Sequence, residues 1–267
     1  MVNYHKINYF CHKSDGIMEF ASKLAATTLV LLSLLALSCN KQDVPEEPEK
    51  VVVPEAVDLG LSVKWASFDV GATQPGEVGW FVSWGETAPK DTYYKWENYA
   101  WCNRSDTQLT KYNFKESFGS NPDYRVALKP EDDIAYVLYG EDWHVPTKEE
   151  VQELIDAPFI THSVVTVDGI DCLKLTSAKT GQSIMFPAGG NCSNTMYPQG
   201  ENYAGYFWTA EIEYTTLLFQ MDATYPSNAA CLMVSPFVRT STFNNMYMPN
   251  LARAYGMNVR AVYGKRY

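Results

Sequence analysis

The stretch Glu141-Asp-Trp-His-Val-Pro-Thr-Lys-Glu-Glu-Val-Gln-Glu-Leu-Ile-Asp156 decides the fold, because it contains a complete helix start. Thr147 and Glu150 have the spacing of a capping box, in which each side chain accepts a hydrogen bond from the other residue's backbone N–H. Apolar residues then recur at helical spacing, and they are Val151, Leu154 and Ile155. The sequence therefore predicts a capped helix that begins at Thr147.

The same stretch places His144 close to several glutamates, so catalysis and metal binding are alternatives to a structural role. Histidine can act as a general base near neutral pH, and His144 could ligate a cation together with Glu149, Glu150 and Glu153. However, Glu150 is used by the capping box, and the helix dipole alone favours acidic residues in a first turn. We therefore expect a structural role for His144, with no catalytic residue and no metal.

A second helix is predicted just before this stretch, over Pro130-Glu-Asp-Asp-Ile-Ala-Tyr-Val-Leu-Tyr139. Its first turn holds a proline, whose missing backbone N–H costs no hydrogen bond there, and acidic residues, which the helix dipole favours. Gly140 follows as a stop signal.

Ahead of this helix, residues 56–72 predict two short strands around a turn at Gly60, and residues 79–85 predict another strand.

Strands dominate the chain after Pro158. Residues 161–167 and 170–176 flank Asp168-Gly169, which is a strong signal of a β-hairpin. Further strands are predicted at residues 183–187, 205–210, 215–220 and 258–262. Polar loops are predicted between them, at residues 188–204 and 224–254. The predicted fold class is α+β, mostly antiparallel, with two helices in the first half and long irregular loops.

The beginning of the chain has the pattern of an export signal. Residues 24–37 form an apolar run that is too short for a membrane span and suits a signal peptide. The run ends at Ser38-Cys39, and a small residue directly before a cysteine resembles the bacterial lipobox, where the chain is cleaved and the cysteine is lipidated. We expect residues 1–38 to be a signal peptide, with Met18 as an alternative start, and Cys39 to carry a lipid. The alternative is a plain secretory signal with an incidental cysteine.

Residues 39–53 combine Cys39 with an acidic, proline-bearing stretch that has little to bury, so they predict an extended linker. We expect residues 54–267 to form a single domain. The net charge of −10 at pH 7 makes nucleic acid and anionic lipid surfaces poor partners. The expected location is the outer membrane, at the cell surface, with the lipid anchor as the contact to the membrane.

Four cysteines remain in the predicted domain: Cys102, Cys172, Cys192 and Cys231. Export implies a compartment in which disulfides persist, and four cysteines allow three pairings. Free buried thiols are the alternative. A Cys-x-x-Cys motif is absent from the sequence, so its spacing does not favour a zinc or redox site.

Several blocks, taken in order, carry a family resemblance: Val57-Asp-Leu-Gly-Leu-Ser-Val-Lys-Trp-Ala, Gly79-Trp-Phe-Val-Ser-Trp-Gly-Glu, Trp101-Cys-Asn, Leu109-Thr-Lys-Tyr-Asn, Asp142-Trp-His-Val-Pro-Thr-Lys-Glu-Glu, Phe186-Pro-Ala-Gly-Gly, Gly205-Tyr-Phe-Trp-Thr-Ala and Asn258-Val-Arg-Ala-Val. Over roughly residues 55–263 the chain resembles the Fibrobacter succinogenes major paralogous domain, found in surface lipoproteins of gut and oral Bacteroidetes.

The resemblance implies a C-type-lectin-like domain, related to the formylglycine-generating-enzyme-like fold. Such a domain is a compact α+β unit whose closing Val-Arg strand pairs with the first strand and whose long loops gather on one face. Folds of this kind serve mainly as ligand-binding platforms. His144 stands where the family usually has arginine, so the salt bridge of that arginine is not carried over.

The calcium motifs of true C-type lectins, Glu-Pro-Asn, Gln-Pro-Asp and Trp-Asn-Asp, do not occur in the sequence. A sugar site can still be built from aromatic rings, which stack on sugar C–H faces, and from amides, which bind hydroxyls. The candidate residues lie in two loops: Trp96, Tyr99, Trp101 and Asn103 in one, and Asn191, Asn194, Tyr197, Gln199 and Asn202 in the other. Core packing of the tryptophans and simple loop solvation of the amides are the alternatives.

Enzymatic motifs are missing from the sequence. It has no Gly-x-Ser-x-Gly elbow and no glycine-rich nucleotide-binding loop. The formylglycine-generating family uses a close pair of cysteines near its C-terminal end, whereas Cys192 and Cys231 are far apart in sequence. We expect a non-catalytic binding protein without a cofactor, whose partner is a glycan or a protein and whose role is adhesion. A structural or tip subunit of a surface assembly is the alternative, and an enzyme the more remote one.

Overall fold

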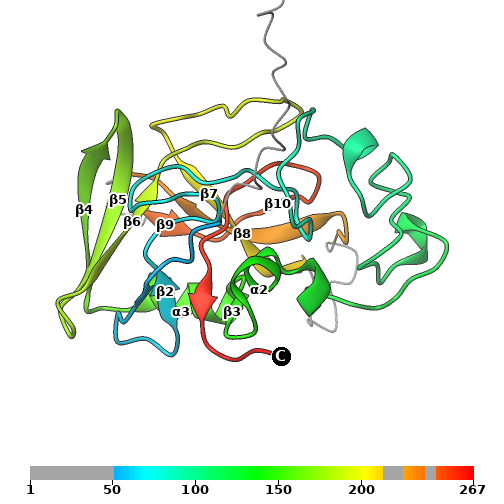
Figure 1. Cartoon of the computed structure of the whole chain (residues 1–267). Coiled ribbons are helices and arrows are strands. Elements are labelled where there is room, and N and C mark those ends of the chain that lie inside the picture. Colours follow the sequence, from blue (N-terminus) through cyan, green and yellow to red (C-terminus); the bar gives the residue numbers. More distant parts are fainter. Residues whose placement is uncertain (1–50, 213–224, 238–244) are drawn as a thin grey trace, which may run out of the picture. The chain divides into compact units, whose positions relative to one another are not determined.

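The computed structural model describes residues 51–212, 225–237 and 245–267 (Figure 1). These residues belong to one compact unit, Val51–Tyr267. The predicted signal peptide, Cys39 and most of the linker lie outside the described residues, as does the strand predicted at 215–220. The domain is α+β and mostly antiparallel, as the sequence predicts.

The first sheet brings the two ends of the domain together. Its strands, in the order β1-β2-β11-β3, are β1 (Ala56–Val57), β2 (Lys64–Ala66), β11 (Val262–Tyr263) and β3 (Trp143–His144). Val262 pairs with Trp65 on one side and with His144 on the other. The closing strand thus pairs with β2, the second strand, while β1 lies at the edge of the sheet.

Two further antiparallel sheets form the second half. One has the strand order β4-β5-β6, from β4 (Ile160–Val167), β5 (Ile170–Ser177) and β6 (Ser183–Pro187). The other has the order β10-β8-β7, with β9 also paired to β8, from β7 (Gly205–Ile212), β8 (Asn228–Val234), β9 (Met246–Tyr247) and β10 (Asn250–Ala252). Figure 1 shows β4 and β5 standing at one side of the domain.

The predicted hairpin is confirmed. Asp168 and Gly169 connect β4 to β5 with φ angles of 49° and 84°. A type I′ turn needs two residues with positive φ, and Asp-Gly tolerates this conformation at low cost. Val167 pairs with Ile170 directly across the turn.

The predicted capped helix is also confirmed, as α3 (Lys148–Asp156). The Thr147 hydroxyl accepts from the Glu150 N–H at 3.1 Å, and the Glu150 carboxylate accepts from the Thr147 N–H at 2.7 Å. Val151 and Leu154 are buried on its inner face.

The helix predicted over residues 130–139 is wrong in its continuity. It consists of a 3₁₀ turn, η4 (Pro130–Asp132), followed by α2 (Ile134–Tyr139). Asp133 separates the two as the N-cap of α2, because its carboxylate accepts from the N–H groups of Ala135 and Tyr136. The same carboxylate also accepts from the Val145 N–H, a partner that local sequence could not reveal.

Three predictions need correction, two of strands and one of a loop. Residues 79–85 make a single bridge, Val82 to Met257, rather than a strand. The predicted loop 224–254 contains β8, β9 and β10. Most residues of β8 are buried, on both faces of the sheet, so its sequence lacks the apolar–polar alternation that identifies a half-exposed strand. The strand predicted at 258–262 is reduced to its last residue plus Tyr263.

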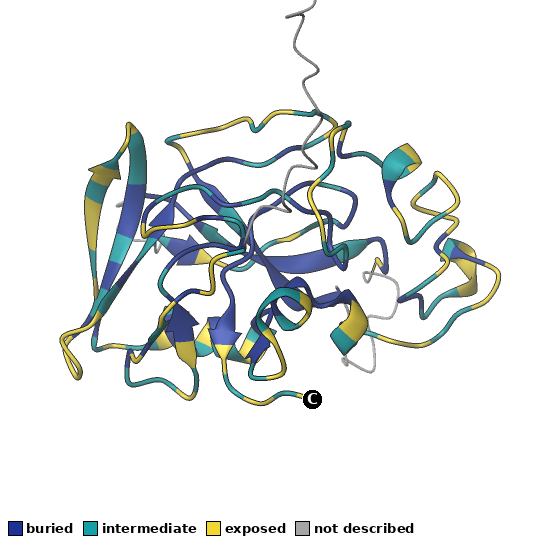
Figure 2. Cartoon of the chain, in the orientation of Figure 1, coloured by how far each residue is buried: buried dark blue, intermediate teal, exposed yellow. Residues whose placement is uncertain are grey.

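The core holds paired charges as well as apolar side chains. Trp65, Trp84 and Trp208 are all fully buried, and Figure 2 shows the buried residues concentrated in the interior strands. Arg260 and Asp69 are buried with them, with the guanidinium Nε and the carboxylate Oδ1 2.6 Å apart. Arg260 also donates to the Ala66 carbonyl at 3.1 Å, so this ion pair ties the closing segment to the opening one.

Candidate ligand-binding site

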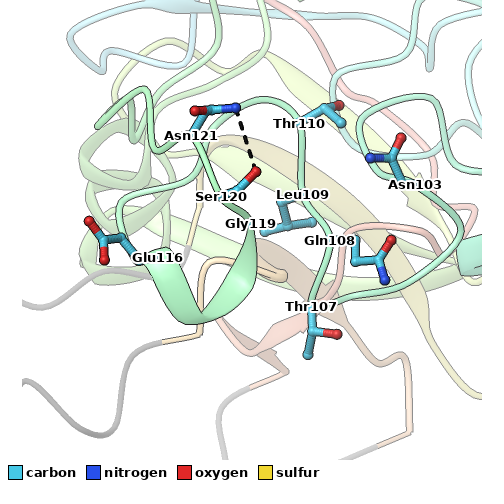
Figure 3. A pocket seen from close by; sticks show the side chains of 9 residues that line it. All are labelled: Asn103, Thr107, Gln108, Leu109, Thr110, Glu116, Gly119, Ser120 and Asn121. Atoms are coloured by element: carbon cyan, nitrogen blue, oxygen red, sulfur yellow. Dashed lines mark hydrogen bonds between the residues drawn. The ribbon is translucent and has the colours of Figure 1, made fainter.

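A polar pocket of about 390 Å³ lies between residues 103–110 and residues 116–121, and we call it the amide pocket (Figure 3). Its lining residues are Asn103, Thr107, Gln108, Leu109, Thr110, Glu116, Gly119, Ser120 and Asn121. The pocket volume falls in the range of about 300–1,000 Å³ that is usual for small-ligand sites.

The lining offers mostly uncharged hydrogen-bonding groups. Within the described part of the chain, the side chains of Asn103, Gln108 and Glu116 make no hydrogen bond. The Asn121 amide donates to the Ser120 hydroxyl only at 3.5 Å, as drawn in Figure 3. Since Glu116 is the single ionisable residue among the described residues of the lining, the pocket suits a ligand that is rich in hydroxyls rather than an anion.

The backbone of the two segments fixes the shape of the amide pocket. The Leu109 N–H donates to the Phe118 carbonyl at 2.6 Å, and the Asn103 N–H donates to the Gln108 carbonyl at 2.8 Å. A Cβ atom at Gly119 would lie 2.2 Å from the Leu109 carbonyl oxygen. Only glycine allows this close approach of the two segments.

The buried Asn113 and the half-buried Asp123 hold the backbone around the pocket in place. The Asp123 carboxylate accepts from the N–H groups of Tyr112 and Asn113, at 2.9 Å each. The Asn113 amide in turn donates to the Gly119 carbonyl at 3.2 Å. The polar groups behind the pocket are thus paired, whereas those that line it are largely free.

Arg253 anchors the same loop to the core. Its guanidinium donates to the Tyr112 carbonyl at 3.0 Å and lies 5.3 Å and 5.5 Å from the ring centres of Trp84 and Tyr99. Among the described residues it forms no salt bridge. Burial lowers the pKa of Arg253. Sequence reasoning missed this residue, because its partners are about 140 positions away in the chain.

The aromatic residues of the first predicted loop are largely used by the fold. Tyr99 is buried, and its hydroxyl donates to the Trp84 carbonyl at 2.8 Å, so its prediction as a ligand contact is corrected. Trp96 is half-buried and packs edge-on against Tyr99. Trp101 is half-buried, with its indole N–H on the Gly85 carbonyl at 3.1 Å. Only Asn103 from this loop lines the amide pocket.

In the second predicted loop, residues 191–202, some candidate side chains are used by the fold and others are exposed. Asn202 is committed to structure, because its side-chain oxygen accepts from the Asp171 N–H at 2.8 Å. Tyr197, Asn194 and Gln199 are exposed, and Tyr197 is 75% accessible. Asn191 is half-buried and lines a different hollow from the amide pocket.

The two predicted loops touch at one place. The Tyr94 N–H donates to the Thr195 carbonyl at 3.0 Å, and the Asn194 N–H donates to the Tyr94 carbonyl at 3.1 Å. This contact lies next to Trp96 in the chain, but Asn103 and Asn191 line separate hollows. The candidate residues of the two loops are therefore divided between two hollows and do not share one.

His144 is buried, and both of its ring nitrogens lie within hydrogen-bond distance of partners. Its Nδ1 lies 2.9 Å from the Gly264 carbonyl, and its Nε2 lies 3.0 Å from the Glu150 carboxylate. His144 thus links the closing segment of the chain, through Gly264, to the first turn of α3, through Glu150. Hydrogen bonding and charge from His144 help to lower the pKa of Glu150 against the raising effect of burial. The described residues contain no group of three or more His, Cys, Asp or Glu placed to hold a metal ion.

The four domain cysteines are free thiols. Cys172, Cys192 and Cys231 are buried, and burial raises the pKa of Cys192 to about 12. Burial raises the pKa of Cys102 and Cys231 as well. A thiol that stays protonated at neutral pH is a poor nucleophile. Cys172, Cys192 and Cys231 are small core residues, and Cys102 is partly buried.

Comparisons with protein-family models, with curated proteins and with solved structures found no match for this chain. None of the helices in the described residues is long and apolar enough to cross a membrane.

Proposed function

We propose that this chain is a lipid-anchored cell-envelope protein whose domain binds a glycan in the amide pocket and performs no chemistry. The observation that supports this most is the pair of free side-chain amides, Asn103 and Gln108, in a pocket of about 390 Å³ whose described lining has a single carboxylate. Amides both donate and accept hydrogen bonds, so they match sugar hydroxyls, which do the same.

The charge of the pocket favours a neutral ligand. Of the residues that the structure describes, no lysine or arginine lines the amide pocket, so a phosphate or sulfate group would lack the cationic partner that such groups usually have. Catalysis has little support at this site. In the described part of the lining, its hydroxyl groups have no histidine or lysine beside them to act as a general base.

The anchor is proposed from the sequence. Cys39 would carry the lipid and the acidic linker would give the domain reach from the outer membrane, with the domain displayed at the cell surface. Replacing Cys39 with serine should move the protein from the membrane fraction to the soluble fraction. Retention of the Cys39→Ser protein in the membrane would overturn the anchor.

A second candidate is a structural or tip subunit of a surface assembly. Exposed aromatic side chains favour it, because Tyr197, Tyr203 and Phe237 are 75%, 77% and 59% accessible and a partner protein could cover them.

A glycan array probed with the secreted Cys39→Ser protein separates these functions. We expect binding to neutral glycans, and loss of that signal in an Asn103→Ala/Gln108→Ala double variant. A Gln74→Ala/Gln182→Ala variant is the matched control, because both of these glutamines are exposed and line neither hollow. An empty array, combined with co-purification of other envelope proteins from cells, would favour the assembly subunit instead.

A further inference from the structure

A second hollow, of about 230 Å³, opens on the sheet formed by β7, β8, β9 and β10. Three tyrosines line it, Tyr206, Tyr247 and Tyr255, so we call it the tyrosine hollow. Its volume lies below the range of drug-sized sites, so it fits a single ring rather than a larger molecule.

Strand register creates the floor of the tyrosine hollow. Tyr206 on β7 pairs with Met233 on β8, and Met233 pairs with Tyr247 on β9. Residues directly opposite each other on neighbouring strands point to the same face of a sheet, with Cβ atoms about 5 Å apart. The three side chains therefore form one continuous row across three strands.

The opposite face of these strands holds the row in place. Phe207, Leu232 and Val234 alternate with the floor residues and are buried in the main apolar core. A shift of register by one residue would expose this apolar set to solvent. The aromatic floor is thus fixed by the core and does not depend on a ligand.

One wall of the tyrosine hollow comes from a distant loop. Asn191 and Ser193 line the hollow, and Cys192 between them exchanges two backbone hydrogen bonds with Gly256, at 2.8 Å and 2.9 Å. This pairing sets the loop beside Tyr255, the neighbour of Gly256 in sequence. An amide and a hydroxyl therefore stand over an aromatic floor.

The hydrogen-bonding groups of the tyrosine hollow are free. No hydrogen bond to another described residue is made by the hydroxyls of Tyr206, Tyr247 and Tyr255, or by the side chains of Asn191 and Ser193. The described residues of the lining include no charged side chain. Aromatic faces with free hydroxyls and one amide match a ring that has apolar C–H faces and a polar edge.

We propose that the tyrosine hollow binds one neutral sugar ring, as a second glycan contact that is separate from the amide pocket. The inference rests on the proposed function for the class of ligand, but it uses none of the amide-pocket residues. Acidic sugars are disfavoured, because a carboxylate would find no cation in the lining.

The test compares single-tyrosine variants of the secreted Cys39→Ser protein on an array of neutral and acidic glycans. Tyr247 is 48% accessible on the short strand β9, so Tyr247→Ala should leave the fold intact. We expect this variant to lose roughly tenfold or more in affinity for the neutral glycans that use the hollow. Tyr93→Ala is the control, because Tyr93 is 49% accessible and lies outside the hollow.

The outcomes separate this inference from the proposed function. If Tyr247→Ala binds every glycan as the parent does while Asn103→Ala/Gln108→Ala does not, the tyrosine hollow is not a sugar site and the amide pocket stands. If Tyr247→Ala alone loses binding, the hollow is the sugar site and the amide pocket is not. Selective binding of a proline-rich peptide, with no glycan bound, would overturn the sugar assignment of the hollow.

Discussion

Polar side chains are paired in one part of the molecule and free in another. The first part is the set of ion-paired and hydrogen-bonded pairs Asp69–Arg260 and His144–Glu150, which we call the buried frame, and the second is the amide pocket. In the frame, Asp69 meets Arg260 at 2.6 Å and His144 meets Glu150 at 3.0 Å, with Asp69 and Arg260 fully buried. In the pocket, the side chains of Asn103 and Gln108 reach solvent and have no partner among the described residues. Stability and binding should therefore depend on different residues, and substitutions can test that separation.

The frame should show the largest effect. Asp69→Ala leaves the Arg260 guanidinium buried without its carboxylate, so we expect a loss of about 3–5 kcal/mol in the free energy of unfolding. Urea unfolding of the secreted protein measures this loss. An Asp69→Leu/Arg260→Met double variant should recover much of it, because no unpaired charge remains. A loss below about 1 kcal/mol for Asp69→Ala would show that the ion pair is not part of the frame.

Arg253 joins the two regions, so its substitution should affect both. Arg253→Met removes the donor to the Tyr112 carbonyl, and we expect a loss of about 2 kcal/mol in unfolding free energy. Binding at the amide pocket should weaken as well, because the loop loses its anchor. Arg125→Met is the control, since Arg125 is exposed. Full glycan affinity in Arg253→Met would break the proposed link between the frame and the pocket.

The pH dependence of stability should reveal a further buried carboxyl. Burial raises the pKa of Glu211 from 4.5 to about 6. The folded state thus binds this proton more tightly than the unfolded state, so the contribution is full below about pH 4.5 and is lost as the pH rises through about 6. The stability difference between the parent and Glu211→Gln should shift against the parent by up to about 2 kcal/mol between pH 4.5 and pH 7.5. A difference that stays constant over this range would contradict the raised pKa.

Local signals in the sequence were enough to predict part of the fold. The capping box of Thr147 and Glu150 and the Asp168-Gly169 hairpin each depend on a few neighbouring residues, and both are confirmed. Strand β8 was missed because it is buried on both faces. The break in the helix predicted at 130–139 was missed because Asp133, which separates the two parts, is held by a bond to Val145 that local sequence does not show.

The candidate sites were harder to predict than the fold. Asn103 was predicted, but residues 116–121 of the amide pocket come from a second segment, which the hydrogen bond from Leu109 to Phe118 joins to the first. The tyrosine hollow depends on the register of β7, β8 and β9, and β8 and β9 fall in a segment predicted as loop. Tyr99 is of a residue type that is common in sugar sites, but its side chain is buried in the core.

The most direct test of the separation measures affinity and stability on the same double variant, Asn103→Ala/Gln108→Ala. Titration of the glycan with the strongest array signal should show a loss of roughly tenfold or more in affinity. Urea unfolding of the same protein should stay within about 0.5 kcal/mol of the parent, as for surface substitutions in general. Unchanged affinity would contradict the amide pocket as the binding site, and a matching loss of stability would contradict the separation of pocket and frame.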